Sequence, residues 1–248
     1  MSDSINLKIQ EIKTSKNKVK RDDIQEQEII PKHPFRAILS GRSGSGKSNL
    51  LINLLIQEHF YKNYFHFIFL ISPTAGKLDD SFIALKNSKC KSKIAIVNVL
   101  NPDTIESIMN TNKELIEEKG VDKAPRILIV YDDVVAEKRF MNSKSFTQSF
   151  IASRHYNASV IICTQRYNSV PRVCRLQANA VFFFKGSNSE TAILAEEFCP
   201  AGYSKKEFLS VIEYAVRDPF NFLFVNDTCK DHKHKYRKNL EQILELVK

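Results

Sequence analysis

Short, uninterrupted runs of apolar residues recur along the chain and alternate with longer segments whose apolar residues are spaced as on a helix. The runs predict strands at residues 35–39, 65–71, 94–99, 127–131, 159–163, 180–184 and 222–225. Within the runs, apolar residues do not alternate with polar ones, which is typical of strands buried on both faces. The pattern therefore predicts an α/β fold in which helices cover both faces of a mostly parallel sheet.

Helical spacing predicts helices at residues 47–61, 102–118, 143–154 and 189–198. A further apolar stripe, made of Leu240, Ile243, Leu244 and Val247, predicts a helix near the end of the chain. The elements divide the chain into a polar, flexible tail at 1–30, one folded domain at 31–228, and a basic, helical tail at 229–248.

Charge and cysteine content narrow the class of protein. The chain has 37 Lys and Arg against 28 Asp and Glu, a net charge of +9, which favours a polyanionic partner such as DNA. Its five cysteines are widely spaced and include no C-x-x-C pair, which argues against a disulfide framework or a zinc finger. The chain has no secretory h-region and no apolar run long enough to span a bilayer, so we expect a soluble, intracellular protein without a membrane partner.

Three of the seven glycines fall within six residues, between the first predicted strand and the first predicted helix. They belong to a segment that matches G-x-x-x-x-G-K-[ST]: Gly41, Arg42, Ser43, Gly44, Ser45, Gly46, Lys47 and Ser48. Glycines let such a loop turn its backbone N–H groups toward phosphate oxygens, and the following helix presents its positive end to the same anion. We expect the loop to bind ATP, with Lys47 on the β- and γ-phosphates and Ser48 on Mg²⁺.

Two later strands end in polar residues suited to the same chemistry. The run at 127–131 leads into Asp132 and Asp133, at the edge where open α/β sheets bind ligands. Asp132 is suited to hold Mg²⁺, and Asp133 to orient or deprotonate an attacking water. The run at 159–163 leads into Thr164 and Gln165, whose amide can hydrogen-bond a γ-phosphate or that water.

These segments together resemble the FtsK–HerA superfamily of DNA-pumping ATPases, and most closely the genome-packaging ATPases of poxviruses, giant DNA viruses and virophages. The resemblance covers about residues 33–226 and rests on a set of short motifs: Pro34-Phe35-Arg36, the P-loop, Ile71-Ser72-Pro73-Thr74, Asp132-Asp133, Arg154-His155-Tyr156-Asn157, Thr164-Gln165-Arg166 and Ala178-Asn179. Bacterial FtsK translocases usually carry Glu where this chain has Asp133.

The resemblance implies a RecA-like P-loop NTPase core. In this core the strand at 159–163, called the sensor strand, lies between the P-loop strand at 35–39 and the Asp132 strand at 127–131. It also implies a homo-oligomeric ring that threads double-stranded DNA and hydrolyses ATP between subunits, with a capsid or portal protein as a further partner. A neighbour's arginine completes the site in such rings; Arg154 has the best motif support, with Arg166, Arg172 and Arg175 as alternatives. For a viral protein of this kind, the expected location is the host-cell cytoplasm, in the virus factory, and the virion.

Other functions fit the motifs less well. A GTPase would need Asn-Lys-x-Asp at a strand end, and a nucleotide kinase would need an Arg-rich lid rather than Thr164 and Gln165. A scaffold protein would be expected to have lost Lys47 or the acidic pair. A helicase or a conjugation-type DNA-transfer ATPase stays open as the alternative motor. Two basic segments, the lysines between residues 86 and 93 and the stretch 230–238, are candidates for sequence-independent DNA contact.

Overall fold

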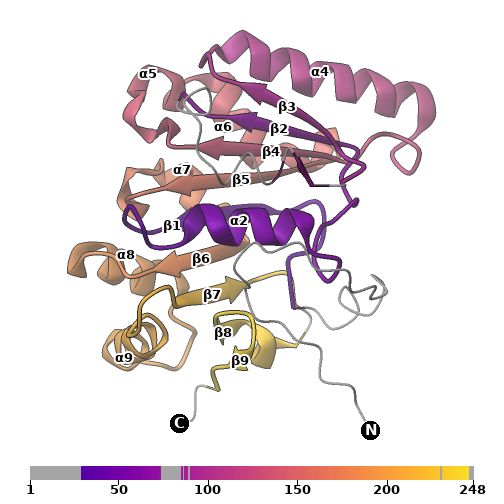
Figure 1. Cartoon of the computed structure of the whole chain (residues 1–248). Coiled ribbons are helices and arrows are strands. Elements are labelled where there is room, and N and C mark those ends of the chain that lie inside the picture. The colour runs from indigo at the N-terminus through magenta and orange to yellow at the C-terminus, as the bar shows by residue number, and fades with distance from the viewer. Residues whose placement is uncertain (1–28, 74–84, 86, 89, 230, 246–248) are drawn as a thin grey trace, which may run out of the picture.

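The computed structural model describes residues 29–73, 85, 87–88, 90–229 and 231–245. Strands within these residues form one sheet in the order β3-β2-β4-β5-β1-β6-β7-β8-β9 (Figure 1). Their bounds are β1 Arg36–Ser40, β2 Phe67–Ile71, β3 Lys93–Val97, β4 Ile127–Asp132, β5 Ala158–Thr164, β6 Ala180–Phe184, β7 Phe222–Asn226, β8 Tyr236–Lys238 and β9 Gln242–Ile243. Strands β3 through β6 in this order pair in parallel, and β7, β8 and β9 add antiparallel strands at one side.

Helices connect the parallel strands and lie on both faces of the sheet (Figure 1). The α-helices are α2 Lys47–Ile56, α4 Pro102–Lys119, α5 Lys138–Met141, α6 Lys144–Ile151, α7 Arg172–Arg175, α8 Asn188–Phe198 and α9 Lys205–Ala215. Short 3₁₀ turns lie at η1 Val134–Ala136, η2 Ser153–Tyr156, η3 Tyr167–Ser169 and η4 His232–His234. These crossovers are what parallel pairing requires, because successive parallel strands cannot be joined by tight turns.

Two apolar cores lie on opposite faces of the sheet, because neighbouring residues of a strand point to opposite faces. On β1, Ala37 and Leu39 join the core beneath α2, whereas Ile38 joins the core beneath α4, α6, α8 and α9. All seven residues of β5 are buried. The central strands are therefore apolar on both faces, and the predicted α/β class with helices on both faces of a mostly parallel sheet is confirmed.

Among the described helices, α5, α7 and α9 were not predicted from the apolar pattern, and α9 is the longest of the three. Helix α9 begins after Ser204, whose side chain accepts a hydrogen bond from the Glu207 N–H while the Glu207 carboxylate accepts one from the Ser204 N–H. This reciprocal cap satisfies two backbone donors at the helix start. The Ser-x-x-Glu signal was present in the sequence, ahead of Phe208 and Ile212 at helical spacing.

The helix predicted near the end of the chain is wrong. Residues 236–238 and 242–243 form strands β8 and β9, and β8 pairs antiparallel with β7. Asn239 adopts a left-handed backbone conformation at the turn between them, with φ 56°. Tyr236, Leu240 and Leu244 are buried, so the apolar stripe covers the end of the sheet instead of one side of a helix.

Both predicted domain boundaries also need correction. Ile29 and Ile30, assigned to the tail, are 4% and 3% exposed and pack in the α2-side core. At the other end, β8 and β9 extend the sheet beyond residue 228, so the described part of 229–248 belongs to the same folded unit. Residues 1–28 lie outside the described residues. Among the residues that are described, no helix is long and apolar enough to cross a membrane.

Candidate functional site

The glycine-rich loop runs from the end of β1 to the start of α2. Gly44 and Gly46 have φ values of 74° and 101°, a region that residues with a Cβ rarely adopt. Gly46 is the N-cap of α2, and its carbonyl accepts the first helical hydrogen bond from Leu50 at 2.9 Å. The loop therefore leads directly into the N-terminus of α2, where the partial positive charge of a helix favours a bound anion.

The loop is closely packed at Gly41 and open at Gly44. A Cβ added to Gly41 would lie 2.6 Å from Phe184 Cβ and 2.6 Å from Ser45 Oγ, whereas one added to Gly44 would meet nothing within 4 Å. The Lys47 ammonium donates to the carbonyls of Gly41 and Arg42 at 2.6 and 3.1 Å. Ser45 Oγ is buried and has no hydrogen-bond partner among the described residues. These features fit a loop that receives phosphate oxygens.

The two carboxylates lie where β4 ends, and they have different surroundings. Asp132 is the last residue of β4 and accepts a hydrogen bond from the Ser72 hydroxyl at 3.3 Å. Asp133 follows in a left-handed conformation with φ 50°, which Asp tolerates better than most residues. Ser72 belongs to one of the motifs noted in the sequence.

Strand β5 joins the loop and the carboxylates into one site. On one side of β5, the Gly41 N–H donates to the Thr164 carbonyl at 3.1 Å. On the other side, the Asp133 N–H donates to the Cys163 carbonyl at 3.3 Å. The Gln165 amide, just past the strand, donates to Asp133 Oδ1 at 3.5 Å. The structure thus brings the loop, the acidic pair and Gln165 together at one sheet edge, with β5 between β1 and β4.

The buried Cys163 thiol lies close to the charged groups of this edge. Burial raises its pKa well above the ordinary value, and the carboxylates of Asp132 and Asp133 raise it further, while the Lys47 ammonium lowers it. Cys163 is therefore a neutral core residue. Lys47 and both carboxylates therefore lie close enough to the Cys163 thiol to act on it electrostatically.

A buried network holds the loop that follows Gln165. The Tyr167 N–H donates to Glu190 Oε1 at 2.8 Å, and its hydroxyl donates to Glu197 Oε2 at 2.7 Å. Arg175 Nε donates to Glu197 Oε1 at 2.9 Å, in an ion pair whose side chains are 11% and 8% exposed. Tyr167 is thus a core residue. Arg175 was an alternative for the arginine that acts on a neighbouring subunit, but its side chain is held in an ion pair within its own chain. Sequence reasoning missed both glutamates, although Ser187 and Glu190 form a recognisable capping box.

Several motif residues lie at the opposite end of the parallel strands, where these strands begin, and they have structural roles. Asn157 donates to the carbonyls of Ala124 and Pro125 at 3.2 Å and accepts from the His33 ring at 2.8 Å. Asn179 accepts from the Arg36 N–H at 2.8 Å, where β1 begins. These asparagines fix the starts of the central strands rather than binding a ligand.

Arg154 is exposed on η2, immediately before β5. It therefore lies at the start of the strand whose other end carries Gln165. Seven residues of β5 span about 20 Å, at roughly 3.3 Å per residue. The side chain consequently cannot reach the glycine loop of its own chain.

The metal-binding capacity of the site is modest. No group of three or more His, Cys, Asp or Glu side chains suited to a metal gathers anywhere in the described residues. Mg²⁺ is ordinarily held by one or two protein oxygens together with phosphates and water, so a magnesium site does not require such a group. Of the predicted basic cluster, Lys91 and Lys93 are exposed, whereas Lys86, Lys89 and Lys230 lie outside the described residues.

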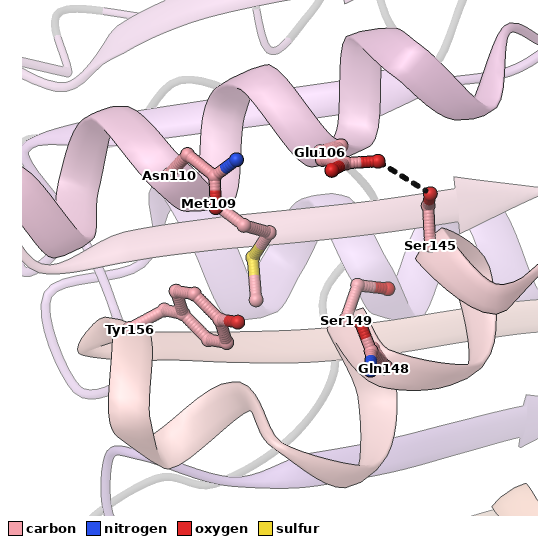
Figure 2. Close-up of a pocket in the computed structure, with 7 residues that line it drawn as sticks. All are labelled: Glu106, Met109, Asn110, Ser145, Gln148, Ser149 and Tyr156. Carbon is pink, nitrogen blue, oxygen red and sulfur yellow. Dashed lines mark hydrogen bonds between the residues drawn. The ribbon is translucent and has the colours of Figure 1, made fainter.

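A small pocket lies elsewhere, between α4 and α6 (Figure 2). Met109 and Tyr156 form part of its lining, and Glu106 and Ser145 close one side with a hydrogen bond of 3.4 Å. It contains none of the residues predicted to bind nucleotide. The glycine loop, not this pocket, is therefore the candidate site.

Comparisons with known proteins agree with the motif set. The family model described as "Poxvirus A32 protein" matches residues 23–236. The chain is 27% identical over 186 residues to DNA packaging protein OPG160 of Monkeypox virus, covering 75% of this chain and 59% of the relative. The same protein of Vaccinia virus (strain Copenhagen) is also 27% identical over 186 residues, covering 75% and 66%. The matched region thus spans about 59–66% of the length of these relatives.

Two solved structures share the fold of this chain. The genome packaging NTPase B204 from Sulfolobus turreted icosahedral virus 2, in complex with ATPγS, matches 86% of this chain and 100% of its own with a TM-score of 0.56 and 15% identity. EssC (ATPases 2 and 3) from Geobacillus thermodenitrificans matches 85% of this chain and 40% of its own, with a TM-score of 0.56 and 14% identity. At these identities the likeness shows a shared fold.

Proposed function

Because the chain belongs to the poxvirus A32 protein family, we propose that it is an ATP-hydrolysing motor that moves double-stranded DNA into a preformed viral capsid. The observation that carries the proposal is the position of β5 between β1 and β4, with Lys47, Asp133 and Gln165 at one sheet edge. Relatives of the chain are named DNA packaging proteins, and a protein of the same fold has been solved with ATPγS.

In this proposal, residues 41–48 bind the triphosphate. Backbone N–H groups around Gly44 and Gly46 face the phosphate oxygens, and Lys47 moves from the loop carbonyls to the β- and γ-phosphates. The unpartnered Ser45 hydroxyl gains an acceptor when phosphate oxygens enter. Ser48 and Asp132 are the residues that would hold Mg²⁺, which supplies positive charge for the transferring phosphoryl group.

Hydrolysis uses the side chains at the ends of β4 and β5. Asp133 orients a water for in-line attack on the γ-phosphate and accepts its proton. Gln165, which contacts Asp133 Oδ1, hydrogen-bonds the same water or the γ-phosphate. In this proposal, a change at Gln165 shifts the exposed Arg166 that follows it, while Tyr167 stays anchored to Glu190 and Glu197.

A ring of identical subunits completes the site. Arg154 lies at the edge opposite its own glycine loop, so in a head-to-tail ring it reaches the γ-phosphate of a neighbour. Exposed Arg166 and Arg172, next to the sensor strand, are suited to DNA phosphates. A capsid or portal protein is the further partner, and the virus factory and virion are the expected locations. The folded ATPase domain in this proposal includes the described residues between 29 and 245.

The first test is ATP turnover of the purified chain at low salt, with and without duplex DNA. Low salt matters because phosphate contacts weaken steeply as salt rises. We expect duplex DNA to stimulate turnover and Lys47→Ala to abolish it. Turnover that is unchanged in Lys47→Ala would refute the site, and turnover indifferent to DNA in assembled rings would refute the translocase.

A second test addresses the ring. Arg154→Ala should lose turnover, whereas Arg139→Ala, which removes another exposed arginine, should keep it. Mixing Arg154→Ala subunits with Lys47→Ala subunits should restore activity, because an intact loop then meets an intact arginine across an interface. Mixed rings that stay inactive would contradict the role of Arg154.

A further inference from the structure

Phe220 is a large apolar side chain in an unfavourable position. It is 70% exposed and has φ 65°, in the left-handed region that bulky residues rarely adopt. Burial does not stabilise this side chain, and the backbone conformation is unfavourable for a bulky residue. Strained, exposed residues of this kind concentrate at ligand sites, where another molecule supplies the missing contact.

The position of Phe220 is next to the glycine loop. A Cβ added to Gly46 would lie 3.5 Å from the Phe220 ring and 3.7 Å from the Phe184 ring. The reason lies in the sheet: β7 runs antiparallel to β6 and pairs Phe222 with Phe184, so the start of β7 meets the end of β6 at the edge that carries the loop. The ring therefore borders the loop at its β6–β7 side.

The turn that carries Phe220 is built from polar contacts. The Asp218 carboxylate accepts hydrogen bonds from Asn221 Nδ2 and Lys238 Nζ, both at 3.2 Å. Asn239, which follows β8, accepts from the Phe222 N–H at 3.1 Å and donates to Asn221 Oδ1 at 3.0 Å. The strands added at the end of the chain thus hold this turn in place, and the Phe220 ring is presented from a fixed backbone.

The order of the strands indicates how a bound nucleotide would be oriented across the sheet. Asp132 and Asp133 end β4, two strands to one side of β1, whereas Phe220 precedes β7, two strands to the other side. Under the proposed function, the γ-phosphate faces the carboxylates. The α-phosphate and nucleoside must then leave the loop toward β6 and β7, where Phe220 lies.

We propose that the Phe220 ring stacks on the base of the bound nucleoside triphosphate. This inference rests on the proposed nucleotide site and adds a base contact to it. Stacking on an aromatic ring tolerates any base, because every base presents a π-face. The ring therefore strengthens binding of ATP and GTP alike and has no effect on a ligand that consists of phosphates only.

The test compares ATP with inorganic tripolyphosphate on the full chain. Phe220→Ala should weaken ATP binding about tenfold, within the range for loss of one stacked base, and leave tripolyphosphate binding unchanged. Phe220→Tyr should restore ATP binding. The control is Val99→Ala, which removes another exposed apolar side chain, 67% exposed, beyond β3 at the far end of the sheet.

The outcomes separate the two proposals. Loss of both ligands in Lys47→Ala supports the phosphate site whatever Phe220 does. If Phe220→Ala binds ATP as tightly as the unaltered chain, the base contact is refuted while the phosphate site stands. If neither ligand binds the unaltered chain, the proposed function itself fails.

Tryptophan fluorescence provides an independent test of the contact between residue 220 and the base. The chain contains no tryptophan, so Phe220→Trp introduces a single indole at the proposed base site. ATP should quench its fluorescence by stacking, whereas tripolyphosphate should leave the emission unchanged. Emission that is unaffected by saturating ATP, or equally affected by both ligands, would overturn the contact.

Discussion

The stability of the fold should depend on pH through His33. Its ring lies between two partners: Nε2 is 2.8 Å from Asn157 Oδ1, and Nδ1 is 2.7 Å from Ser159 Oγ. Since Asn157 Oδ1 only accepts, Nε2 must carry the proton. The Ser159 hydroxyl accepts from the Phe35 N–H and is left to donate to Nδ1. The neutral ring satisfies every partner in this network. A protonated ring would make Ser159 Oγ accept from both Nδ1 and the Phe35 N–H, and the hydroxyl hydrogen would have to turn away from the ring.

The pKa of His33 is lowered from 6.5 to about 4: burial lowers it most, the Asn157 hydrogen bond raises it, and the Arg126 charge lowers it. The unfolded chain therefore binds a proton near pH 6.5, before the folded chain does. The stabilisation by neutral His33 is complete above that pH and is lost as the pH falls toward 4. At about 1.4 kcal/mol for each tenfold change in proton affinity, the loss is about 3 kcal/mol.

The assay is urea unfolding of the unaltered chain and of His33→Gln at several pH values. His33→Gln is less stable above pH 6.5 because it loses a fitted ring, but it has no imidazole to protonate. The difference in free energy of unfolding should shrink by about 3 kcal/mol as the pH falls to about 4. Other groups titrate in both proteins and cancel in the difference. A constant difference over this range would refute the buried, neutral His33.

Three further outcomes follow from the site. Gly41→Ala should lower the free energy of unfolding by about 1–3 kcal/mol in urea, because its Cβ would lie 2.6 Å from Phe184 Cβ. Tyr167→Phe should cost about 1–3 kcal/mol in the same assay, because it leaves a buried Glu197 oxygen without its donor. Asp133→Asn should reduce ATP turnover at least about 100-fold while leaving the urea midpoint unchanged, because Asn also tolerates the left-handed backbone at φ 50°. An active Asp133→Asn would remove that residue from the mechanism.

The central strands and the glycine loop could be predicted because their signals are local. A continuous apolar run such as 159–163 has few alternatives to a buried strand, and the loop's glycines are needed for backbone conformations that other residues avoid. The order of strands came from the resemblance to packaging ATPases, since no local pattern states which strands pair. That order is confirmed, with β5 between β1 and β4.

The end of the chain was mispredicted because its structure depends on distant contacts. Leu240 and Leu244 fit a helical stripe, but Tyr236 pairs with Val225 of β7 and its hydroxyl donates to the Phe198 carbonyl. Pairing at the end of a sheet outweighs a short helical pattern, whose intrinsic preference is weak. The same dependence hid Phe220, because nothing in the sequence around it says that β7 returns beside the glycine loop.

The motif residues divide between the two ends of the parallel strands. Several of those where the strands begin have structural roles, and the candidate nucleotide-binding residues lie where the strands end. At the edge where the parallel strands end, β5 brings the loop, Asp133 and Gln165 within hydrogen-bond contact. At the edge where they start, Asn157 and Asn179 fix the strands, and Arg154 projects on η2. Strand β5, about 20 Å long, keeps Arg154 and the glycine loop of one chain far apart. Under the proposed function, head-to-tail association would bring the Arg154 of one subunit to the glycine loop of the next, and we expect hydrolysis to depend on assembly for that reason.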